Sequence, residues 1–153
     1  MAKIAIVVGS ESDLAYVASA EEVLKENQVP YEITVLSAHR KPNETAEFSR
    51  KAAGRGVRII IAAAGLSAAL PGFIASHTTL PVIGIPVVTG PLNGVDALLS
   101  ILQMPSGVPL ATVGLGKQGP KNAALLALRI LNLFEEKTPE AVQRKSSTRS
   151  LRA

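Results

Sequence analysis

Five short apolar segments, each followed by a loop of small and polar residues, constrain the fold of this sequence more than any other feature. They occupy residues 3–9, 31–36, 57–62, 81–86 and 109–114. Continuous apolar runs of this length are typical of parallel strands that are buried on both faces of a sheet. The sequence therefore predicts a sheet of five parallel strands.

The segments between these runs carry apolar residues at helical spacing. They predict helices over residues 10–28, 42–53, 66–76 (broken near Pro71 and Gly72), 93–103 and 122–135. Pro42 suits the first turn of its helix, because proline lacks a backbone donor that this turn does not need. Regular alternation of strands and helices with short links predicts one doubly wound α/β domain with right-handed crossovers.

Composition narrows the class of protein further. The chain has 153 residues, of which 47% are hydrophobic, so a single domain with an ample core is expected. The absence of cysteine excludes disulfides, thiolate metal sites and a cysteine nucleophile, and it fits a reducing cytoplasm. No signal peptide is visible, and no apolar stretch reaches the roughly 20 residues that cross a membrane.

The net charge of +4 is concentrated at one end of the chain. Residues 1–136 hold 11 basic and 11 acidic side chains, whereas residues 137–153 hold five basic side chains against Glu140. A neutral body with a basic tail offers no face for nucleic acid. We expect a catalytic domain over residues 1–136 and a solvated or neighbour-docking tail over residues 137–153.

The middle of the chain is almost free of charge. Between residues 59 and 116 the only formally charged side chain is Asp96, which we expect to be buried and hydrogen-bonded. A surface exposed to water needs charge, and small and polar residues interrupt this stretch too often for a membrane span. Extensive contact between subunits is therefore the preferred interpretation.

A short loop after the second predicted strand carries chemically active side chains. Ser37, His39 and Arg40 lie together there, and the chain has only one other histidine, His77. Ligands bind at the carboxyl ends of strands in open α/β sheets. An imidazole moves protons near neutral pH, and a guanidinium binds anions. An ordinary solvated connection is the alternative for this loop taken alone.

The loop after the first predicted strand allows two compatible interpretations. Ser10 and Asp13 have the spacing of a capping box at the start of a helix. The same Gly9-Ser10 turn is also suited to hold a phosphate at a helix amino terminus, in which case Asp13 would accept hydrogen bonds from sugar hydroxyls. The presence of His39 on the neighbouring loop favours the ligand site.

Three further loops carry weaker signals. Residues 63–72 are small and suit either close ligand approach or tight subunit packing. Residues 89–96 offer Asn93 or Asp96 as a helix cap, and residues 116–122 look like a phosphate loop without the spacing of a Walker motif. No metal site is expected, because the two histidines are far apart in sequence and neither has acidic neighbours in a cluster.

Taken together, these loops resemble the PurE family, the 5-(carboxyamino)imidazole ribonucleotide mutases of purine biosynthesis, over nearly the whole chain. The residues that carry the resemblance are Gly9-Ser10-x-Ser12-Asp13, Ser37-Ala38-His39-Arg40, Ala69-Leu70-Pro71-Gly72, Leu92-Asn93-Gly94-x-Asp96, Gln103-Met104-Pro105 and Gly116-Lys117-x-Gly119-x-Lys121-Asn122.

The resemblance implies a flavodoxin-like three-layer α/β/α sandwich, a homo-octamer and a cofactor-independent isomerase without a metal. It implies that Ser10, Ser37 and Arg40 hold the phosphate of a ribonucleotide, that Asp13 binds the ribose and that His39 is catalytic. It also places substrate contacts at Ala38, Ala64, Gly65, Ser67, Ala68, Ala69 and Leu70.

The implied reaction moves a carboxylate from the exocyclic nitrogen of an aminoimidazole ribonucleotide to the adjacent ring carbon. His39 can protonate the departing nitrogen and later collect the ring proton. Many bacterial members carry histidine immediately before Leu-Pro-Gly, where this chain has Ala69. His77 lies eight positions further, roughly 12 Å along a helix, and is not expected to replace it.

Three alternatives remain open at this point. A related class of enzyme adds free CO2 to aminoimidazole ribonucleotide, although the motifs here resemble the mutases more closely. A flavin module usually stacks aromatic rings on the cofactor, and only 3% of this chain is aromatic. A noncatalytic nucleotide-binding module of the same fold would tolerate the substitution His39→Asn.

Overall fold

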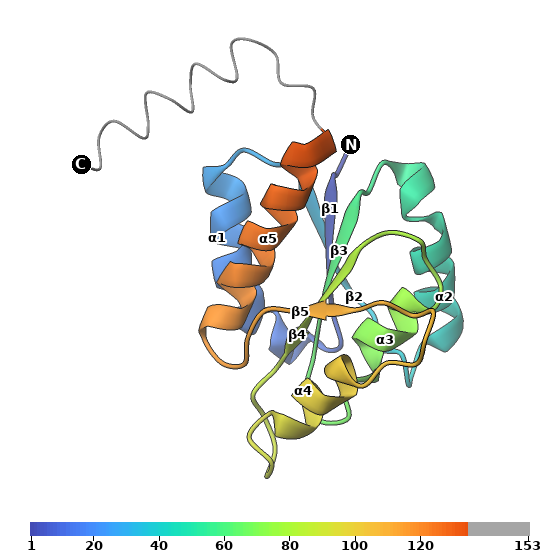
Figure 1. Ribbon diagram of the computed structural model, residues 1–153, viewed down its shortest axis with the longest axis vertical. Helices are drawn as coiled ribbons and strands as arrows, with labels where there is room; N and C mark the ends of the chain where they lie inside the picture. Colours follow the sequence, from blue (N-terminus) through green and yellow to red (C-terminus); the bar gives the residue numbers. More distant parts are fainter. Residues whose placement is uncertain (135–153) are drawn as a thin grey trace, which may run out of the picture.

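The computed structural model describes residues 1–134, so the predicted basic tail and the last two residues of the predicted domain lie outside the described part. Five strands form one sheet (Figure 1). They are β1 (Ile4–Val8), β2 (Tyr31–Val35), β3 (Ile59–Ala64), β4 (Val82–Pro86) and β5 (Ala111–Thr112). The predicted number of strands is confirmed.

All neighbouring strands run parallel, in the order β2-β1-β3-β4-β5. The chain steps from β1 to β2 in one direction and then returns to place β3 on the other side of β1. The direction in which successive strands are added to the sheet therefore reverses between β1 and β3. In open α/β sheets the crevice at such a switch point, beyond the carboxyl ends of the strands, is the usual ligand site.

Helices cover both faces of the sheet, which gives the predicted three layers. Figure 1 shows α1 (Ala18–Glu26) and α5 (Gln118–Phe134) side by side on one face. The other face is covered by α2 (Pro42–Lys51), α3 (Ala69–Ala75) and α4 (Val95–Leu102). Short 3-10 turns add η1 (Glu11–Asp13), η2 (Ala15–Val17) and η3 (Ala53–Arg55).

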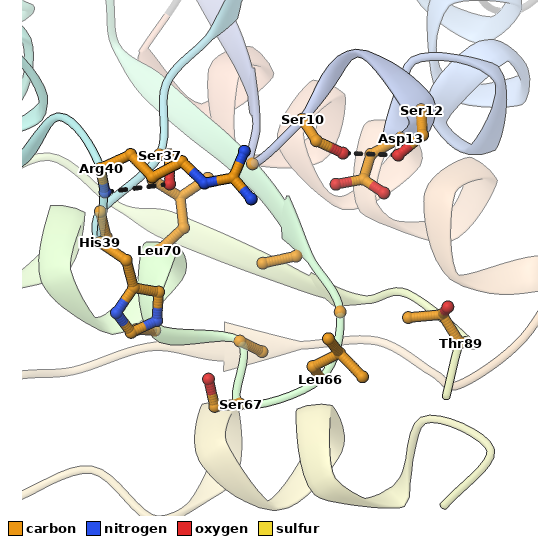
Figure 2. A pocket seen from close by; sticks show the side chains of 16 residues that line it. Ser10, Ser12, Asp13, Ser37, His39, Arg40, Leu66, Ser67, Leu70 and Thr89 are labelled. Atoms are coloured by element: carbon orange, nitrogen blue, oxygen red, sulfur yellow. Dashed lines mark hydrogen bonds between the residues drawn. The ribbon is translucent and has the colours of Figure 1, made fainter. Parts of the chain in front are cut away.

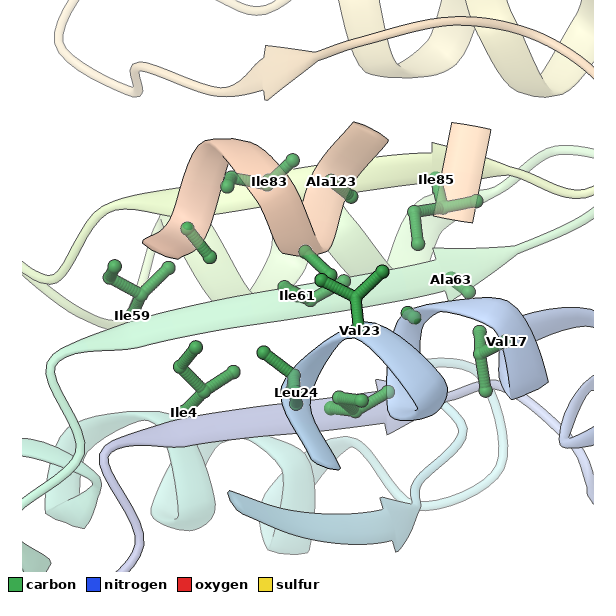
Figure 3. Close-up of a cluster of buried hydrophobic side chains, with 14 of the residues drawn as sticks. Ile4, Val17, Val23, Leu24, Ile59, Ile61, Ala63, Ile83, Ile85 and Ala123 are labelled. Atoms are coloured by element: carbon green, nitrogen blue, oxygen red, sulfur yellow. The ribbon is translucent and has the colours of Figure 1, made fainter. Parts of the chain in front are cut away.

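The core is built from aliphatic side chains that alternate along each strand. Ile4, Ile6 and Val8 point toward α1 and α5, where Val23, Leu24 and the alanines of α5 meet them (Figure 3). Ala5 and Val7 point to the opposite layer. Such alternation follows from the two-residue period of a strand, and it explains why both faces of β1, β3 and β4 are buried.

Several predicted boundaries were wrong. The third strand begins at Ile59 rather than at residue 57, since the amide of Val57 instead closes the preceding turn on Ala52. The fifth strand is only two residues long. The third helix begins at Ala69, so Pro71 lies in its first turn and does not break it, as expected for a residue whose missing amide is not needed there.

The start of α4 also differs from the prediction. Gly94, with a φ of 80°, precedes the helix in place of Asn93 or Asp96. Asp96 is only half-buried, and its Oδ1 is enclosed without a hydrogen-bond partner in the described part of the chain. The prediction of a buried, hydrogen-bonded carboxylate is therefore wrong for that oxygen. Within residues 1–134, no helix is both long and apolar enough to span a membrane.

Two glycines allow a matched test of the packing between the sheet and its helices. A Cβ at Gly84 of β4 would lie 2.9 Å from Ile101 Cγ2 and 3.2 Å from Pro71 Cβ. Gly84→Val should therefore lower the free energy of unfolding by about 1–3 kcal/mol, because the core must move to admit the side chain. Urea denaturation measures this change.

The control is Gly54→Ala, since no atom lies within 4 Å of a Cβ built at Gly54. This substitution should be neutral or raise the free energy of unfolding by about 0.4–1 kcal/mol, because alanine restricts the unfolded chain. Equal effects of the two substitutions would contradict the tight packing of β4 on α3 and α4.

Candidate active site

A cavity of about 320 Å³ lies at the carboxyl ends of β1, β2 and β3, at the switch point of the sheet (Figure 2). The structure brings all twelve of the predicted site residues to its wall. They are Ser10, Asp13, Ser37, Ala38, His39, Arg40, Ala64, Gly65, Ser67, Ala68, Ala69 and Leu70. Their grouping is a property of the structure, and their individual roles remain predictions.

The loop after β2 places His39 and Arg40 in the wall of the cavity. The amide of Lys41 donates to the carbonyl of Ser37 at 2.8 Å, and the amide of Arg40 donates to Ser37 Oγ at 3.3 Å, so a turn fixes this loop. Both His39 and Arg40 are exposed. In residues 1–134 neither side chain forms a hydrogen bond or ion pair, which leaves both available to a ligand.

The loop after β1 does not form the predicted capping box. Ser10 Oγ makes no capping bond and instead lies 2.6 Å from Ser12 Oγ. The predicted helix over residues 10–28 begins as two 3-10 turns, and α1 starts only at Ala18. The Asp13 carboxylate lies over Gly9, where a Cβ would be 3.6 Å from its Oδ2. The hydroxyls and the carboxylate therefore face the cavity.

The loop from β3 to α3 forms the opposite wall and is conformationally unusual. Leu66 and Ala68 have φ values of 54° and 39°, a region that non-glycine residues rarely occupy. Gly65 is closely packed, since a Cβ there would lie 2.4 Å from Thr89 Cγ2. The segment between Gly65 and Leu70 has no ionisable side chain, so this wall is defined by shape and apolar surface.

Four residues that line the cavity were not among the predicted site residues. Gly9 and Ser12 belong to the same loop as Ser10, and their place in the quoted motif could have indicated them. Leu66 and Thr89 gave no comparable signal. Thr89 follows β4, and in the loop after this strand the sequence singles out only Asn93 or Asp96, as a helix cap.

His77 lies outside the cavity. Its ring stacks on Phe73 with centroids 4.5 Å apart, and Nδ1 lies 2.8 Å from the Phe73 carbonyl oxygen. It lines a separate surface hollow between α2 and α3. Asp96 does not reach the site, and neither do residues 116–122, which the structure places largely in the first turns of α5 and not in a phosphate loop. In residues 1–134, no three histidine, aspartate or glutamate side chains gather as metal ligands.

Comparison with known proteins yields a consistent set of relatives. A family model described as AIR carboxylase matches residues 3–150. A Pyrococcus horikoshii protein named N5-carboxyaminoimidazole ribonucleotide mutase is 52% identical over 92% of this chain and 78% of its own. A Bacillus subtilis protein of the same name is 52% identical over 87% of this chain and 82% of its own.

A solved structure described as Treponema denticola PurE matches with a TM-score of 0.78 and 30% sequence identity, and it covers 97% of this chain and 91% of that one. A Schizosaccharomyces pombe protein named phosphoribosylaminoimidazole carboxylase is 51% identical over 86% of this chain, which spans only 24% of that protein. The two proteins named as mutases thus match along most of their own length, whereas the protein named as a carboxylase is matched along only a quarter of its length.

The missing cap leads to a stability test at Ser10. Because Ser10 Oγ makes no capping bond, Ser10→Ala should change the free energy of unfolding by about 0.5 kcal/mol or less. A true helix cap would cost about 0.5–2 kcal/mol. The matched control is Ser49→Ala, since the buried Ser49 hydroxyl donates to the Thr45 carbonyl at 2.7 Å and its removal should cost about 1 kcal/mol. A larger effect at Ser10 than at Ser49 would restore the capping interpretation.

Proposed function

The chain belongs to the AIR carboxylase family, and from that premise we propose that it is an N5-carboxyaminoimidazole ribonucleotide mutase of purine biosynthesis. This isomerase moves the carboxylate of 5-(carboxyamino)imidazole ribonucleotide from the exocyclic nitrogen to ring carbon 4. The observation that carries the proposal is the grouping of His39, Arg40, Ser10 and Asp13 from two loops around one cavity.

The polar half of the cavity suits a ribose phosphate. Ser10, Ser37 and Arg40 supply two hydroxyls and a guanidinium, which are the groups that bind a phosphate. Asp13 would repel a phosphate, but its carboxylate can accept hydrogen bonds from ribose hydroxyls. The ribonucleotide would therefore lie with its phosphate between the ends of β1 and β2.

The apolar half suits a flat imidazole ring. Ala64, Ala68 and Leu70 are buried there, and Gly65 allows the loop to pass close to Thr89. Small side chains leave room for the ring, and Ala38, Ser67 and Ala69 complete the surroundings. Because His39 is on the neighbouring loop of the same cavity, a ring held here is within reach of its imidazole.

The reaction then needs one proton carrier. The carbon–nitrogen bond of the carbamate breaks, its electrons return to nitrogen, and His39 donates a proton to that nitrogen. Ring carbon 4 attacks the released CO2, and the proton displaced from that carbon passes to His39. The proton that His39 gave up is thereby returned to it, so the enzyme ends in its starting state. Confinement of CO2 beside the ring makes its capture by carbon 4 effectively unimolecular.

His39 is the sole imidazole at this cavity. The position before Leu70-Pro71-Gly72 is Ala69, and His77 stacks on Phe73 outside the site. Both proton transfers are therefore assigned to His39. The absence of hydrogen bonds to its ring in residues 1–134 leaves both ring nitrogens available for this work.

We expect His39→Asn to lower kcat by about 10²–10⁴-fold, the usual contribution of general acid–base catalysis. An ultraviolet assay with 5-(carboxyamino)imidazole ribonucleotide measures turnover. The control is His77→Asn, which should keep turnover near that of the parent because His77 lies outside the cavity. Unchanged turnover in His39→Asn would reject the mechanism and favour a noncatalytic module.

The same assay separates the mutase from the carboxylase. The parent enzyme should convert 5-(carboxyamino)imidazole ribonucleotide without added bicarbonate. Conversion that requires aminoimidazole ribonucleotide together with bicarbonate would overturn the proposed substrate. The two substrates differ by the carboxylate itself, so the comparison needs no variant.

We also propose that the protein acts in the cytoplasm as a homo-octamer. The charge-poor middle of the chain supports an assembly, because Leu92, Val95, Leu99 and Leu102 leave apolar surface exposed along α4 and the loop before it. Side chains of this size on one short helix are typical of a surface that another protein covers. A second copy is the partner that needs no further assumption.

Leu99→Glu should therefore dissociate the assembly into smaller species, since a charge buried in a contact is strongly unfavourable. Light scattering measures the particle mass. Leu125→Glu is the matched control, because Leu125 is exposed on α5, a helix that covers the opposite face of the sheet from α4. A parent that is monomeric in dilute buffer would reject the assembly, and equal dissociation by both variants would reject the assignment of the contact to α4.

A further inference from the structure

Leu66 stands out among the residues that line the cavity. Only Leu66 and Leu70 are large aliphatic side chains there, and Leu70 is 2% exposed whereas Leu66 is 53% exposed. Figure 2 shows Leu66 on the side of Ser67 and Thr89, away from Ser10 and Arg40. Leu66 is therefore the one large apolar side chain of the lining that is not buried.

The backbone of Leu66 is strained. Its φ of 54° lies in the left-handed region, which glycine adopts without steric cost and leucine does not. Residues held in such regions persist only when their surroundings fix them, and they concentrate at functional sites. We therefore ask where this strained backbone places the side chain of Leu66.

The side chain of Leu66 is seated on the loop that follows β4. Gly90 has no side chain, and a Cβ built on it would lie 2.5 Å from Leu66 Cδ2. At the neighbouring position, a Cβ on Gly65 would lie 2.4 Å from Thr89 Cγ2. Two glycines thus make room for a contact between the loops after β3 and β4, and Leu66 bridges these loops at the cavity wall.

From this geometry we infer that Leu66 is the residue that retains CO2 in the cavity between the two halves of the reaction. The inference rests on the proposed mutase function. Free CO2 is small and apolar, and no charged group is needed to hold it. An apolar side chain that packs across the contact between the two loops limits the escape of CO2, whereas an opening to water at this place would let CO2 exchange with the solvent.

The test measures the fate of a labelled carboxylate. The full-length enzyme receives 5-(carboxyamino)imidazole ribonucleotide carrying a 13C carboxylate, in excess unlabelled bicarbonate with carbonic anhydrase present. Mass spectrometry of the product gives the fraction that keeps the label. A blank without enzyme corrects for spontaneous loss of CO2 from the carbamate.

The parent should retain most of the label. Leu66→Gly should raise the ratio of lost to retained label by about five- to tenfold, because CO2 escapes faster once the apolar side chain is removed from the wall. Leu66→Met should stay near the parent, since it conserves volume and apolar character. Thermal midpoints and particle mass should be similar for these proteins. Label loss with an altered particle mass would assign Leu66 to a subunit contact and overturn the inference.

Gly90→Ala provides a second, independent variant. Its added methyl group should displace Leu66 and raise label loss in the parent, yet it should add nothing in Leu66→Gly, where no side chain remains to be displaced. The strain of alanine at a φ of 72° is common to both backgrounds and cancels in this double-mutant cycle.

Two negative results are distinguishable. An active parent whose Leu66→Gly and Gly90→Ala variants retain the label as well as the parent does overturns the role of Leu66 alone. A parent that does not convert the labelled substrate at all overturns the proposed function, and the role of Leu66 with it.

Discussion

The site depends on backbone hydrogen bonds that continue the pairing of β1 with β2 and β3 beyond the last residue of β1. The amide of Leu36 donates to the Val8 carbonyl at 2.9 Å, and the amide of Gly9 donates to the Ala63 carbonyl at 3.1 Å. These bonds hold three strand ends at one level. The loops that begin at Ser10, Ser37 and Gly65 must therefore start around a common point, so residues far apart in sequence face one cavity.

Much of this arrangement follows from local sequence. Continuous apolar runs specify buried parallel strands, and the polar residues directly after them are then placed at the ligand-binding edge. For this reason all twelve predicted site residues line the cavity, although the assignment of several of them came from the resemblance to a family rather than from their chemistry. The order of the strands decides which loops meet, and no single strand encodes it.

The failures have two physical causes, one local and one tertiary. Ser10 and Asp13 have the spacing of a capping box, yet Ser10 pairs with Ser12 and the chain continues in 3-10 turns. Leu66 gave no signal, because a leucine with positive φ is unfavourable by itself and is fixed only by its seat on Gly90. Patterns that describe neighbours in sequence cannot report a contact between two loops.

The missing cap and the uncharged loop after β3 together define how a ribonucleotide would be oriented. A Ser10 hydroxyl bound into a helix cap would be less available to a phosphate, whereas the observed Ser10 faces the cavity beside Asp13. All ionisable side chains of the wall lie on the loops after β1 and β2, and the segment from Gly65 to Leu70 has none. With charge on one side and apolar surface on the other, the ribonucleotide of the proposed function would lie with its phosphate toward Arg40 and its ring toward Ala68. In the proposed mechanism that orientation would bring the reacting ring to the apolar side of the cavity, and His39 on the loop after β2 would supply and collect the proton.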